Sequence, residues 1–255
     1  MKKLIWFLTL VLLNASLVNH ASADSFSWYC KREKSNKTPS CPSEFLFIRE
    51  FDGYDCDFKH TNYDDKEKVI YLTFDAGYEN GNVEKTLDIL KEKNVQAAFF
   101  ILGNLVEKNT DLVKRMISEG HLVCNHTYSH RDMSKSGEVE FIEELKRLEA
   151  CCAEKIGQEP SKFYRPPEGR FSHQNLEWAK KCGYKTVFWS FAYADWDNKK
   201  QPDEAYAKNK IFENLHNGEI MLLHPTSDTN CKILGDVIDY ILGEGFRFAS
   251  LSELG

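Results

Sequence analysis

The sequence lacks several features that define whole classes of protein. Its 255 residues carry 39 acidic and 33 basic side chains, so it has no positive excess of the kind that binds nucleic acid. Beyond the N-terminus, no apolar run approaches the roughly 20 residues that span a bilayer. No internal repeat or low-complexity segment occurs. The composition therefore predicts a globular chain without a nucleic-acid partner, and no feature points to a stable protein partner.

The N-terminus has the three parts of a secretory signal peptide. Two lysines precede an apolar run over 4–13, and small residues at 21–23 offer a cleavage site. The run is too short for a comfortable membrane span, so an uncleaved anchor is the less favoured alternative. We therefore expect residues 1–23 to be removed and the secreted chain to begin at Asp24.

All eight cysteines follow this segment. An even number outside the cytosol permits disulfides, but the sequence alone does not fix the pairing. Cys30, Cys41 and Cys56 lie in residues 24–67, an N-terminal extension with little periodicity, where a crosslink would stabilise most. We interpret this extension as an arm that packs on the main domain, residues 68–255, rather than as a separate domain.

From residue 68 onward, strands and helices are expected to alternate. Continuous apolar runs predict buried strands at 69–74, 97–102, 121–125, 185–189, 220–223 and 246–248. Helical spacing and glycine stops predict helices at 83–93, 111–119, 138–156, 174–181, 233–242, and from 202–204 to before Gly218. Repeated strand–helix units in one α/β domain imply a parallel sheet, either closed as a barrel or doubly wound.

The most informative stretch ends the first of these strands. An apolar run over 69–74 leads directly into Asp75, and glycines follow at 77 and 81. A carboxylate at the C-terminal end of a buried parallel strand occupies a common active-site position. The alternative is an aspartate that only caps the next turn or helix.

Other polar residues follow later strands in the same way. His126 and His130, four residues apart, would meet on one side of a helical turn and suit a divalent metal such as zinc. Arg165 opens a rigid Arg-Pro-Pro loop that could hold a guanidinium against a carboxylate. Asp195 and His224 each follow a further strand. Every one of them has an ordinary structural interpretation, but their repetition at successive strand ends indicates a catalytic site.

Five segments in order resemble the motifs of the NodB-type polysaccharide deacetylases: Thr73-Phe74-Asp75-Ala76-Gly77, His126-Thr127-x-x-His130, Arg165-Pro166-Pro167, Asp195-Trp196 and Leu222-Leu223-His224. The resemblance covers about 68–254. The longer stretch 74–81, together with 188–190 and the Asp195-Trp196 pair, resembles a narrower branch. That branch is the delta-lactam-biosynthetic de-N-acetylases of spore-forming bacteria, which act on N-acetylmuramic acid in peptidoglycan.

This resemblance implies a distorted parallel (β/α) barrel that hydrolyses an N-acetyl amide. Asp75 would be the general base that activates water, and Arg165 would hold it charged and oriented. His224 would be the general acid, tuned by Asp195. Such a pair needs opposite pKa tuning, which an arginine beside a carboxylate and a carboxylate beside a histidine provide.

The resemblance also implies the residues that bind metal and substrate. His126 and His130 would hold a divalent metal, with zinc the expected ion. Four further residues of these motifs would line the groove and contact the sugar or its acetyl group: Tyr78, Pro167, Trp196 and Leu222.

Ala76 departs from the wider family, which usually has a second aspartate there as a metal ligand. A methyl group cannot ligate metal, so we expect a weak or exchangeable site. Two nearby residues could compensate. Cys124 is two residues before His126 on the same strand, so both side chains should point to one face, and a thiolate there could bind zinc. Glu79 could reach back from the loop after Ala76.

The sequence therefore predicts a secreted hydrolase of the cell wall or spore envelope. Its expected reaction is removal of the N-acetyl group from N-acetylmuramic acid, on the route to muramic delta-lactam during sporulation. The alternatives are a deacetylase of N-acetylglucosamine in peptidoglycan or chitin-like chains, an esterase acting on xylan, and a wall-binding protein that has lost catalysis. A glycosidase is disfavoured because no acidic pair flanking a bond is evident.

Overall fold

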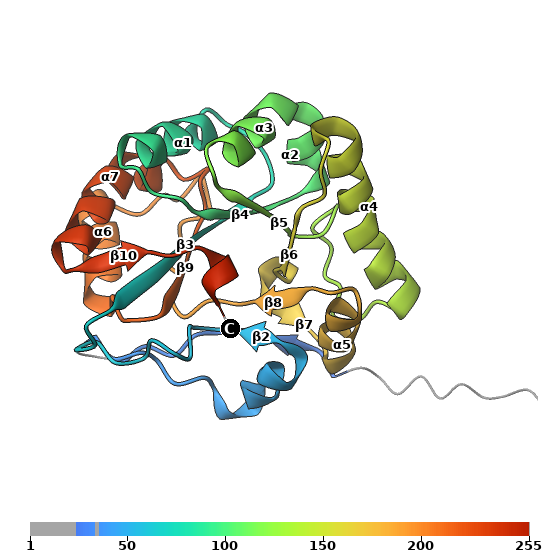
Figure 1. Cartoon of the computed structure of the whole chain (residues 1–255), viewed down its shortest axis with the longest axis horizontal. Coiled ribbons are helices and arrows are strands. Elements are labelled where there is room, and N and C mark those ends of the chain that lie inside the picture. The colour runs from blue at the N-terminus through green and yellow to red at the C-terminus, as the bar shows by residue number, and fades with distance from the viewer. Residues whose placement is uncertain (1–23, 34–35, 255) are drawn as a thin grey trace, which may run out of the picture.

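The computed structural model describes residues 24–33 and 36–254 (Figure 1). The predicted signal peptide, residues 1–23, lies outside these described residues. Among the helices of the described ranges, none has the length and apolar character needed to cross a membrane.

The centre of the structure is a curled sheet in which every paired strand runs parallel to its neighbour. The order is β10-β3-β4-β5-β6-β8-β2, with β9 also paired to β3. The strands are β2 (Gly53–Tyr54), β3 (Lys68–Ala76), β4 (Ala98–Ile101), β5 (Leu122–Asn125), β6 (Ser161–Tyr164), β8 (Lys185–Val187), β9 (Glu219–Leu223) and β10 (Phe246–Phe248).

The segment after β8 brings the sheet round to β9. Phe191 forms a parallel bridge with Met221. Its N–H donates to the carbonyl of Ile220 at 3.3 Å, and its own carbonyl accepts from the N–H of Leu222 at 2.9 Å. The sheet therefore closes as a distorted parallel barrel, which confirms the predicted fold class.

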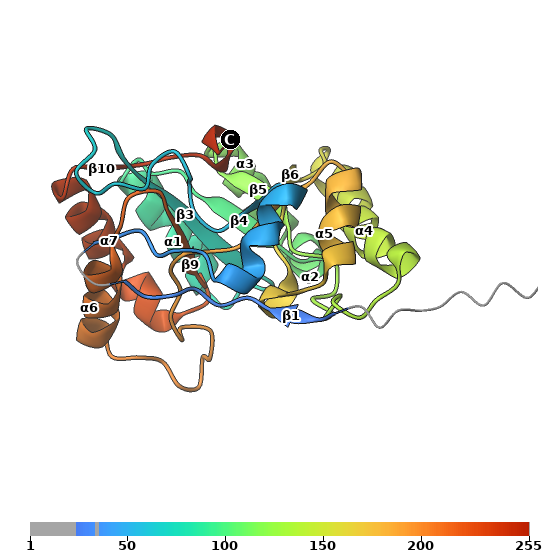
Figure 2. The ribbon, with the colours of Figure 1, turned by 90° about the horizontal axis from the view of Figure 1, so that it is seen from below.

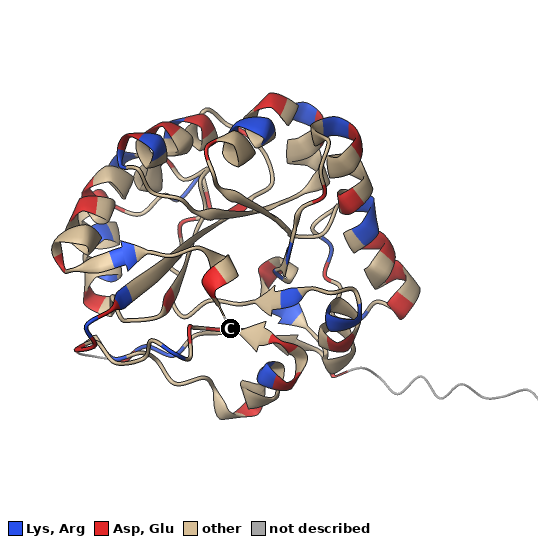
Figure 3. Ribbon diagram, in the orientation of Figure 1, with Lys and Arg blue, Asp and Glu red and all other residues tan. Residues whose placement is uncertain are grey.

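Helices surround this sheet in Figures 1 and 2. They are α1 (Asn82–Glu92), α2 (Gly103–Lys108), α3 (Thr110–Ser118), α4 (Glu138–Ile156), α5 (His173–Lys181), α6 (Glu204–Asn214) and α7 (Asp228–Gly243). Helix α2 was not predicted. Helix α7 begins earlier than predicted because Ser227 caps it, with its side chain accepting from the N–H of Asn230. Acidic and basic side chains are interspersed along the outer helices (Figure 3).

Alternation along β3 sorts its side chains into two apolar layers. Tyr71 belongs to the cluster inside the barrel. Leu72, Phe74 and Ala76 belong to the larger cluster that also contains the apolar faces of the outer helices. Asp75 continues the inner row, so its side chain points to the mouth of the barrel.

The N-terminal extension, drawn in blue in Figure 2, packs against the barrel through short strands and one helix. β1 (Phe26–Ser27) pairs antiparallel with β7 (Arg170–Phe171), and β2 pairs parallel with β8. The 3₁₀ helix η1 (Ser43–Phe51) contacts α5 and contributes Phe45 and Ile48 to a shared apolar cluster. The extension therefore shares an apolar cluster with the main domain.

Candidate active site

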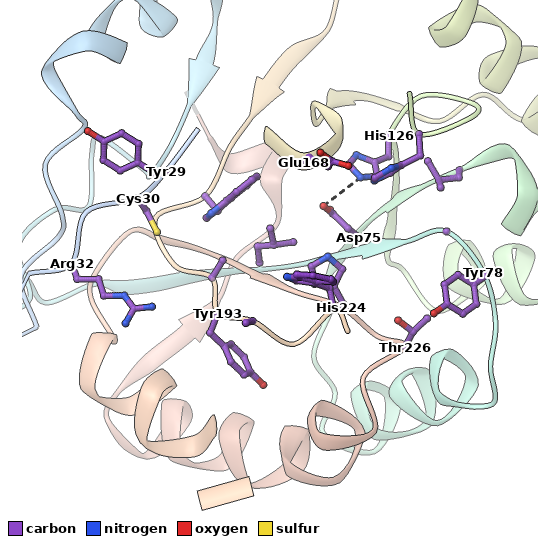
Figure 4. A pocket seen from close by; sticks show the side chains of 18 residues that line it. Tyr29, Cys30, Arg32, Asp75, Tyr78, His126, Glu168, Tyr193, His224 and Thr226 are labelled. Atoms are coloured by element: carbon purple, nitrogen blue, oxygen red, sulfur yellow. Dashed lines mark ion pairs between the residues drawn. The ribbon is translucent and has the colours of Figure 1, made fainter. Parts of the chain in front are cut away.

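A cleft of about 1020 Å³ opens at the C-terminal ends of the strands (Figure 4). It is lined by most of the residues that the sequence analysis selected: Asp75, Tyr78, His126, His130, Trp196, Leu222 and His224. Strands β3 and β9 are neighbours in the sheet, and Asp75 and His224 lie at or just beyond their ends. In Figure 4, Asp75, His126 and His224 point toward the same part of the cleft.

Asp75 is held by a fully buried arginine. Nη1 of Arg165 donates to Oδ1 of Asp75 at 2.8 Å, and Nη2 donates to the hydroxyl of Thr73 at 2.9 Å. The Arg165 guanidinium also lies 4.1 Å from the ring centre of Phe100. Burial would raise the pKa of Asp75, but its interactions with His126, Arg165 and His224 outweigh burial and lower it. Asp75 is therefore an ionised carboxylate at neutral pH.

The contacts of His126 show which of its two ring nitrogens carries the proton. Nδ1 lies 2.8 Å from the carbonyl oxygen of Arg165, which can only accept, so Nδ1 carries the proton. Nε2 is left with a free lone pair, 3.5 Å from Oδ2 of Asp75. Burial lowers the pKa of His126 to about 4, against the opposing charge of Asp75. The ring is neutral at pH 7, as a metal ligand must be.

His130 lies beside His126, but the backbone between them differs from the predicted helical turn. The segment is not a helical turn, because Thr127 and His130 both have positive φ, 69° and 58°. The N–H of His130 donates to the hydroxyl of Thr127 at 3.0 Å, which fixes the tight turn. The two rings approach edge to face with centroids 5.0 Å apart. The expectation of helical geometry was therefore wrong, although the two imidazoles do lie together.

These two imidazoles suit two positions of a divalent metal such as zinc, and the Nδ1 hydrogen bond of His126 is the usual support for such a ligand. No third protein ligand accompanies them: the described part of the chain contains no group of three or more His, Cys, Asp or Glu that could hold a metal. A metal held by His126 and His130 would keep its other positions open.

Neither proposed replacement for the missing ligand is available. Ala76 is fully buried in the outer apolar layer. Cys124 is also fully buried, and burial raises the pKa of its thiol. The thiol therefore stays protonated and only packs in the core. The carboxylate of Glu79 accepts instead from the N–H groups of Gly81 and Glu84 at the start of α1.

His224 is oriented by a buried carboxylate. Oδ1 of Asp195 lies 2.8 Å from Nδ1 of His224, and Oδ2 accepts from the backbone N–H of His224 at 2.8 Å. Burial would lower the pKa of His224, but Asp195 reverses this effect and raises it. Asn230, in the first turn of α7, donates to Oδ2 of Asp195 at 2.6 Å. His224 therefore has the environment of a proton donor.

The predicted substrate contacts divide into two groups. Trp196 and Tyr78 are exposed on the cleft wall, by 63% and 44%, and Leu222 forms part of its floor. Pro167 is buried and is not among the lining residues, while its neighbour Glu168 faces the cleft. The position of Pro167 suits support of the loop rather than contact with a sugar.

Sequence reasoning missed several residues of this site. Tyr29, Cys30 and Arg32 line the cleft although they belong to the N-terminal extension. Asn230 was missed because the predicted helix began after it. The sequence did contain a signal of Asn230: the polar pair Thr229-Asn230 comes just before an apolar helical stretch. Both side chains are buried in the first turn of α7.

This barrel, with an aspartate, an arginine and three histidines at its mouth, matches a known family. Residues 62–187 match the family profile described as polysaccharide deacetylase. The chain is 35% identical over 231 residues to the peptidoglycan-N-acetylmuramic acid deacetylase PdaA of Bacillus subtilis, covering 91% of this chain and 86% of that protein. The chain belongs to the polysaccharide deacetylase family of hydrolases, whose members are generally metal-dependent.

Two further comparisons refine this similarity. A solved structure of Bacillus subtilis PdaA, a family 4 carbohydrate esterase, superposes with a TM-score of 0.84 at 34% identity, covering 91% of this chain and 97% of that one. A peptidoglycan-N-acetylglucosamine deacetylase of Bacillus cereus is 34% identical over 189 residues, covering 72% of this chain and 67% of that protein. The similarity to PdaA therefore includes the N-terminal extension, because a match over 91% of the chain cannot omit it.

Proposed function

We propose that this protein hydrolyses the N-acetyl group of N-acetylmuramic acid residues in peptidoglycan. One observation carries the proposal: the same cleft contains a carboxylate with a lowered pKa, Asp75, and an imidazole with a raised pKa, His224. Amide hydrolysis needs both, a base to activate water and an acid to protonate the departing amine.

The residues of this chain divide the reaction as follows. Asp75 takes a proton from water while the water oxygen forms a bond to the acetyl carbonyl carbon. Arg165 keeps Asp75 ionised and in position. His224 then delivers a proton from Nε2 to the amide nitrogen as the carbon–nitrogen bond breaks, which releases acetate and leaves an amine on the sugar. Asp195 stabilises the imidazolium before that transfer.

His126 and His130 are the residues that would hold a divalent metal. A bound metal supplies Lewis-acid polarisation of the carbonyl oxygen. With two protein ligands and no carboxylate at position 76, we expect weak and exchangeable binding, and zinc remains the expected ion. Hydrogen bonding of His126 to the Arg165 carbonyl links this ligand to the arginine that positions the base.

The size and walls of the cleft agree with a glycan strand as substrate. Its volume of about 1020 Å³ exceeds that of most small-molecule sites, which span roughly 300–1,000 Å³. Trp196 and Tyr78 present exposed aromatic faces on which sugar rings can stack. Leu222, on the floor, is suited to contact the acetyl methyl group.

Muramic acid is favoured over glucosamine because the similarity to the muramic acid deacetylase spans 91% of this chain, against 72% for the glucosamine enzyme. The finer role follows from that substrate: a secreted enzyme of the cell wall or spore envelope, acting on the route to muramic delta-lactam in sporulation. Deacetylation of N-acetylglucosamine is the second candidate. A wall-binding protein without catalysis is the third, and Ala76 is the observation in its favour.

Mass spectrometry of muropeptides before and after digestion tests the proposal. We expect loss of acetyl groups from muramic acid, with glucosamine unchanged. Asp75→Asn is the matched control, since it keeps the shape of the side chain and removes the base. Loss of acetyl from glucosamine alone would support the second candidate, and no loss with retained wall binding would support the third.

A further inference from the structure

We infer that the N-terminal extension adds a subsite to the cleft, in which Arg32 binds the lactyl carboxylate of a muramic acid residue that carries no peptide. This inference rests on the proposed function and deepens it. Muramic acid differs from glucosamine by a lactyl ether on the sugar ring, which ends in a carboxylic acid. Linkage to a peptide converts that acid into a neutral amide.

The extension reaches the cleft through a short segment after β1. Tyr29, Cys30 and Arg32 are lining residues, and Figure 4 shows all three on the wall across from Tyr78. Ala192, in the loop after β8, also lines the cleft, and the indole N–H of Trp28 donates to the carbonyl of Trp189 in that loop. The extension is thus continuous with the wall formed by the loop after β8.

Trp28 anchors this segment firmly. Its backbone N–H donates to the carbonyl of Gly169 at 2.8 Å, and its indole N–H donates to the carbonyl of Trp189 at 3.0 Å. Its ring stacks on Phe188 with centroids 4.6 Å apart. Gly169 has φ +66°, and a Cβ there would lie 2.8 Å from the Trp189 ring and 3.0 Å from Trp28, so the contact admits no larger residue. The segment is therefore fixed to the barrel at Trp28 before substrate binds.

Arg32 is the only lysine or arginine among the lining residues. In the described ranges, no carboxylate forms an ion pair with it, whereas the other arginines near the cleft are paired. Arg165 is paired to Asp75, and Arg170 lies 3.1 Å from Glu168, the second carboxylate of the lining. The cleft therefore presents one exposed cation available to an anionic substrate.

Tyr29 is a second lining residue from the same segment. Its hydroxyl donates to Oε1 of Glu44 at 2.6 Å, and its ring meets Phe45 edge to face at 5.6 Å. The ring is thus held by the extension itself while 47% of the residue stays exposed. An exposed aromatic ring and a guanidinium on one wall of the cleft together suit a sugar that bears a carboxylate.

Guanidinium and carboxylate match as a planar, two-point pair, which a neutral sugar cannot reproduce. Arg32 would therefore favour a peptide-free muramyl residue over N-acetylglucosamine and over a muramyl residue in amide linkage. This preference agrees with a delta-lactam product, because lactam formation joins the freed amine to that same carboxyl group.

The test compares acetate release from two tetrasaccharides of alternating N-acetylglucosamine and N-acetylmuramic acid. One has free lactyl carboxylates and the other has them converted to neutral methylamides. The proteins are the wild type, Arg32→Gln, and Lys31→Gln as a control that removes a neighbouring cation outside the cleft lining. We expect Arg32→Gln to raise KM about tenfold for the carboxylate form with little change in kcat. KM for the methylamide should not change, and Lys31→Gln should behave as the wild type.

Equal KM values of the wild type for the two forms, or equal effects of Arg32→Gln on both, would overturn the subsite. Loss of acetyl from the muramyl residues, located by mass spectrometry of the products, reports separately on the proposed function. If muramyl residues are not deacetylated, titration calorimetry of the wild type and Arg32→Gln with both tetrasaccharides decides the subsite alone. A preference of at least about fivefold for the carboxylate form, lost in the variant, supports it, and no preference refutes it.

Discussion

Arg165 donates a 2.8 Å hydrogen bond to Asp75 from a position that is entirely buried under the mouth of the barrel. Its Nε also donates to the carbonyl of Val187 at 3.1 Å, so the guanidinium joins β3, β6 and β8. An arginine used in this way is both part of the sheet's interior and the partner of the proposed base. Its chemistry and its structural role are therefore inseparable.

Arg165→Lys is expected to be a severe change. Lysine keeps the charge but lacks the fork that reaches Asp75, Thr73 and two carbonyls together. A base displaced by about 1 Å can lose roughly 10²-fold in rate, and we expect a fall of that order in kcat/KM. Steady-state kinetics on peptide-free glycan measures it. Arg170→Lys, at the exposed pair with Glu168, serves as the control, and equal activity of the two variants would remove Arg165 from the mechanism.

His224→Ala should lower kcat by about 10²–10⁴-fold with little change in KM, because a general acid acts only in the chemical step. The control is His173→Ala, since His173 stacks on Phe47 away from the cleft. Near-normal turnover of His224→Ala on an amide substrate would exclude His224 as the acid.

The pH dependence of kcat should follow His224. Asp195 raises the pKa of His224, so the protonated acid persists above pH 6.5 and activity falls as the pH rises through that raised pKa. The stability that this pair contributes is fully present below pH 6.5 and is lost over the same rise. Asp195→Asn removes the opposing charge, so the alkaline limb should move to lower pH. An unmoved limb in pH–rate profiles of the two proteins would contradict this assignment.

Metal binding should depend on His126, whereas a carboxylate at position 76 should act on stability. His126→Ala is expected to abolish zinc binding in calorimetric titrations, whereas the wild type should bind weakly. Ala76→Asp buries a carboxylate in an apolar layer, so its metal-free Tm should fall. Zinc binding unaffected by His126→Ala would refute the site.

Trp28→Ala should cost about 3–5 kcal/mol in the free energy of unfolding, the usual range for removal of a buried tryptophan. Trp28 is only 5% exposed and joins the extension to the Gly169 loop. Tyr206→Ala, which truncates an aromatic residue exposed by 52%, is the control and should be nearly neutral. Chemical denaturation of both variants checks the difference. A loss below about 1 kcal/mol for Trp28→Ala would show that the extension is not anchored there.

The elements best predicted from the sequence were the long, continuous apolar runs and the helices with clear stops. Strand β3 was readable because its burial on both faces removes polar alternation, and α4 because its spacing persists to Gly157. Helix α2 was missed because it is one short segment of six residues without a capping side chain. Such elements owe their stability to tertiary packing, which local pattern does not report.

The residues of the candidate site likewise divide into those that the sequence predicted and those that it did not. Asp75 and His224 follow recognisable strands, so their meeting could be expected from a parallel sheet. Arg32 and Tyr29 could not be expected, because only the docking of Trp28 on residues far along the chain brings them to the cleft. The turn at His126 was mispredicted for a related reason: spacing of four suggests a helix, but Thr127 and His130 adopt left-handed conformations.

The indole of Trp28 joins positions 161 residues apart in sequence. The Trp28 segment therefore finds its partner only after most of the chain has been synthesised, and contacts of such long separation form slowly. Loss of residues 24–28 would leave the Asp75–Arg165 pair in place while removing the anchor of one wall of the cleft. Residues 24–28, although far from Asp75 in the sequence, thus decide whether the barrel keeps that wall.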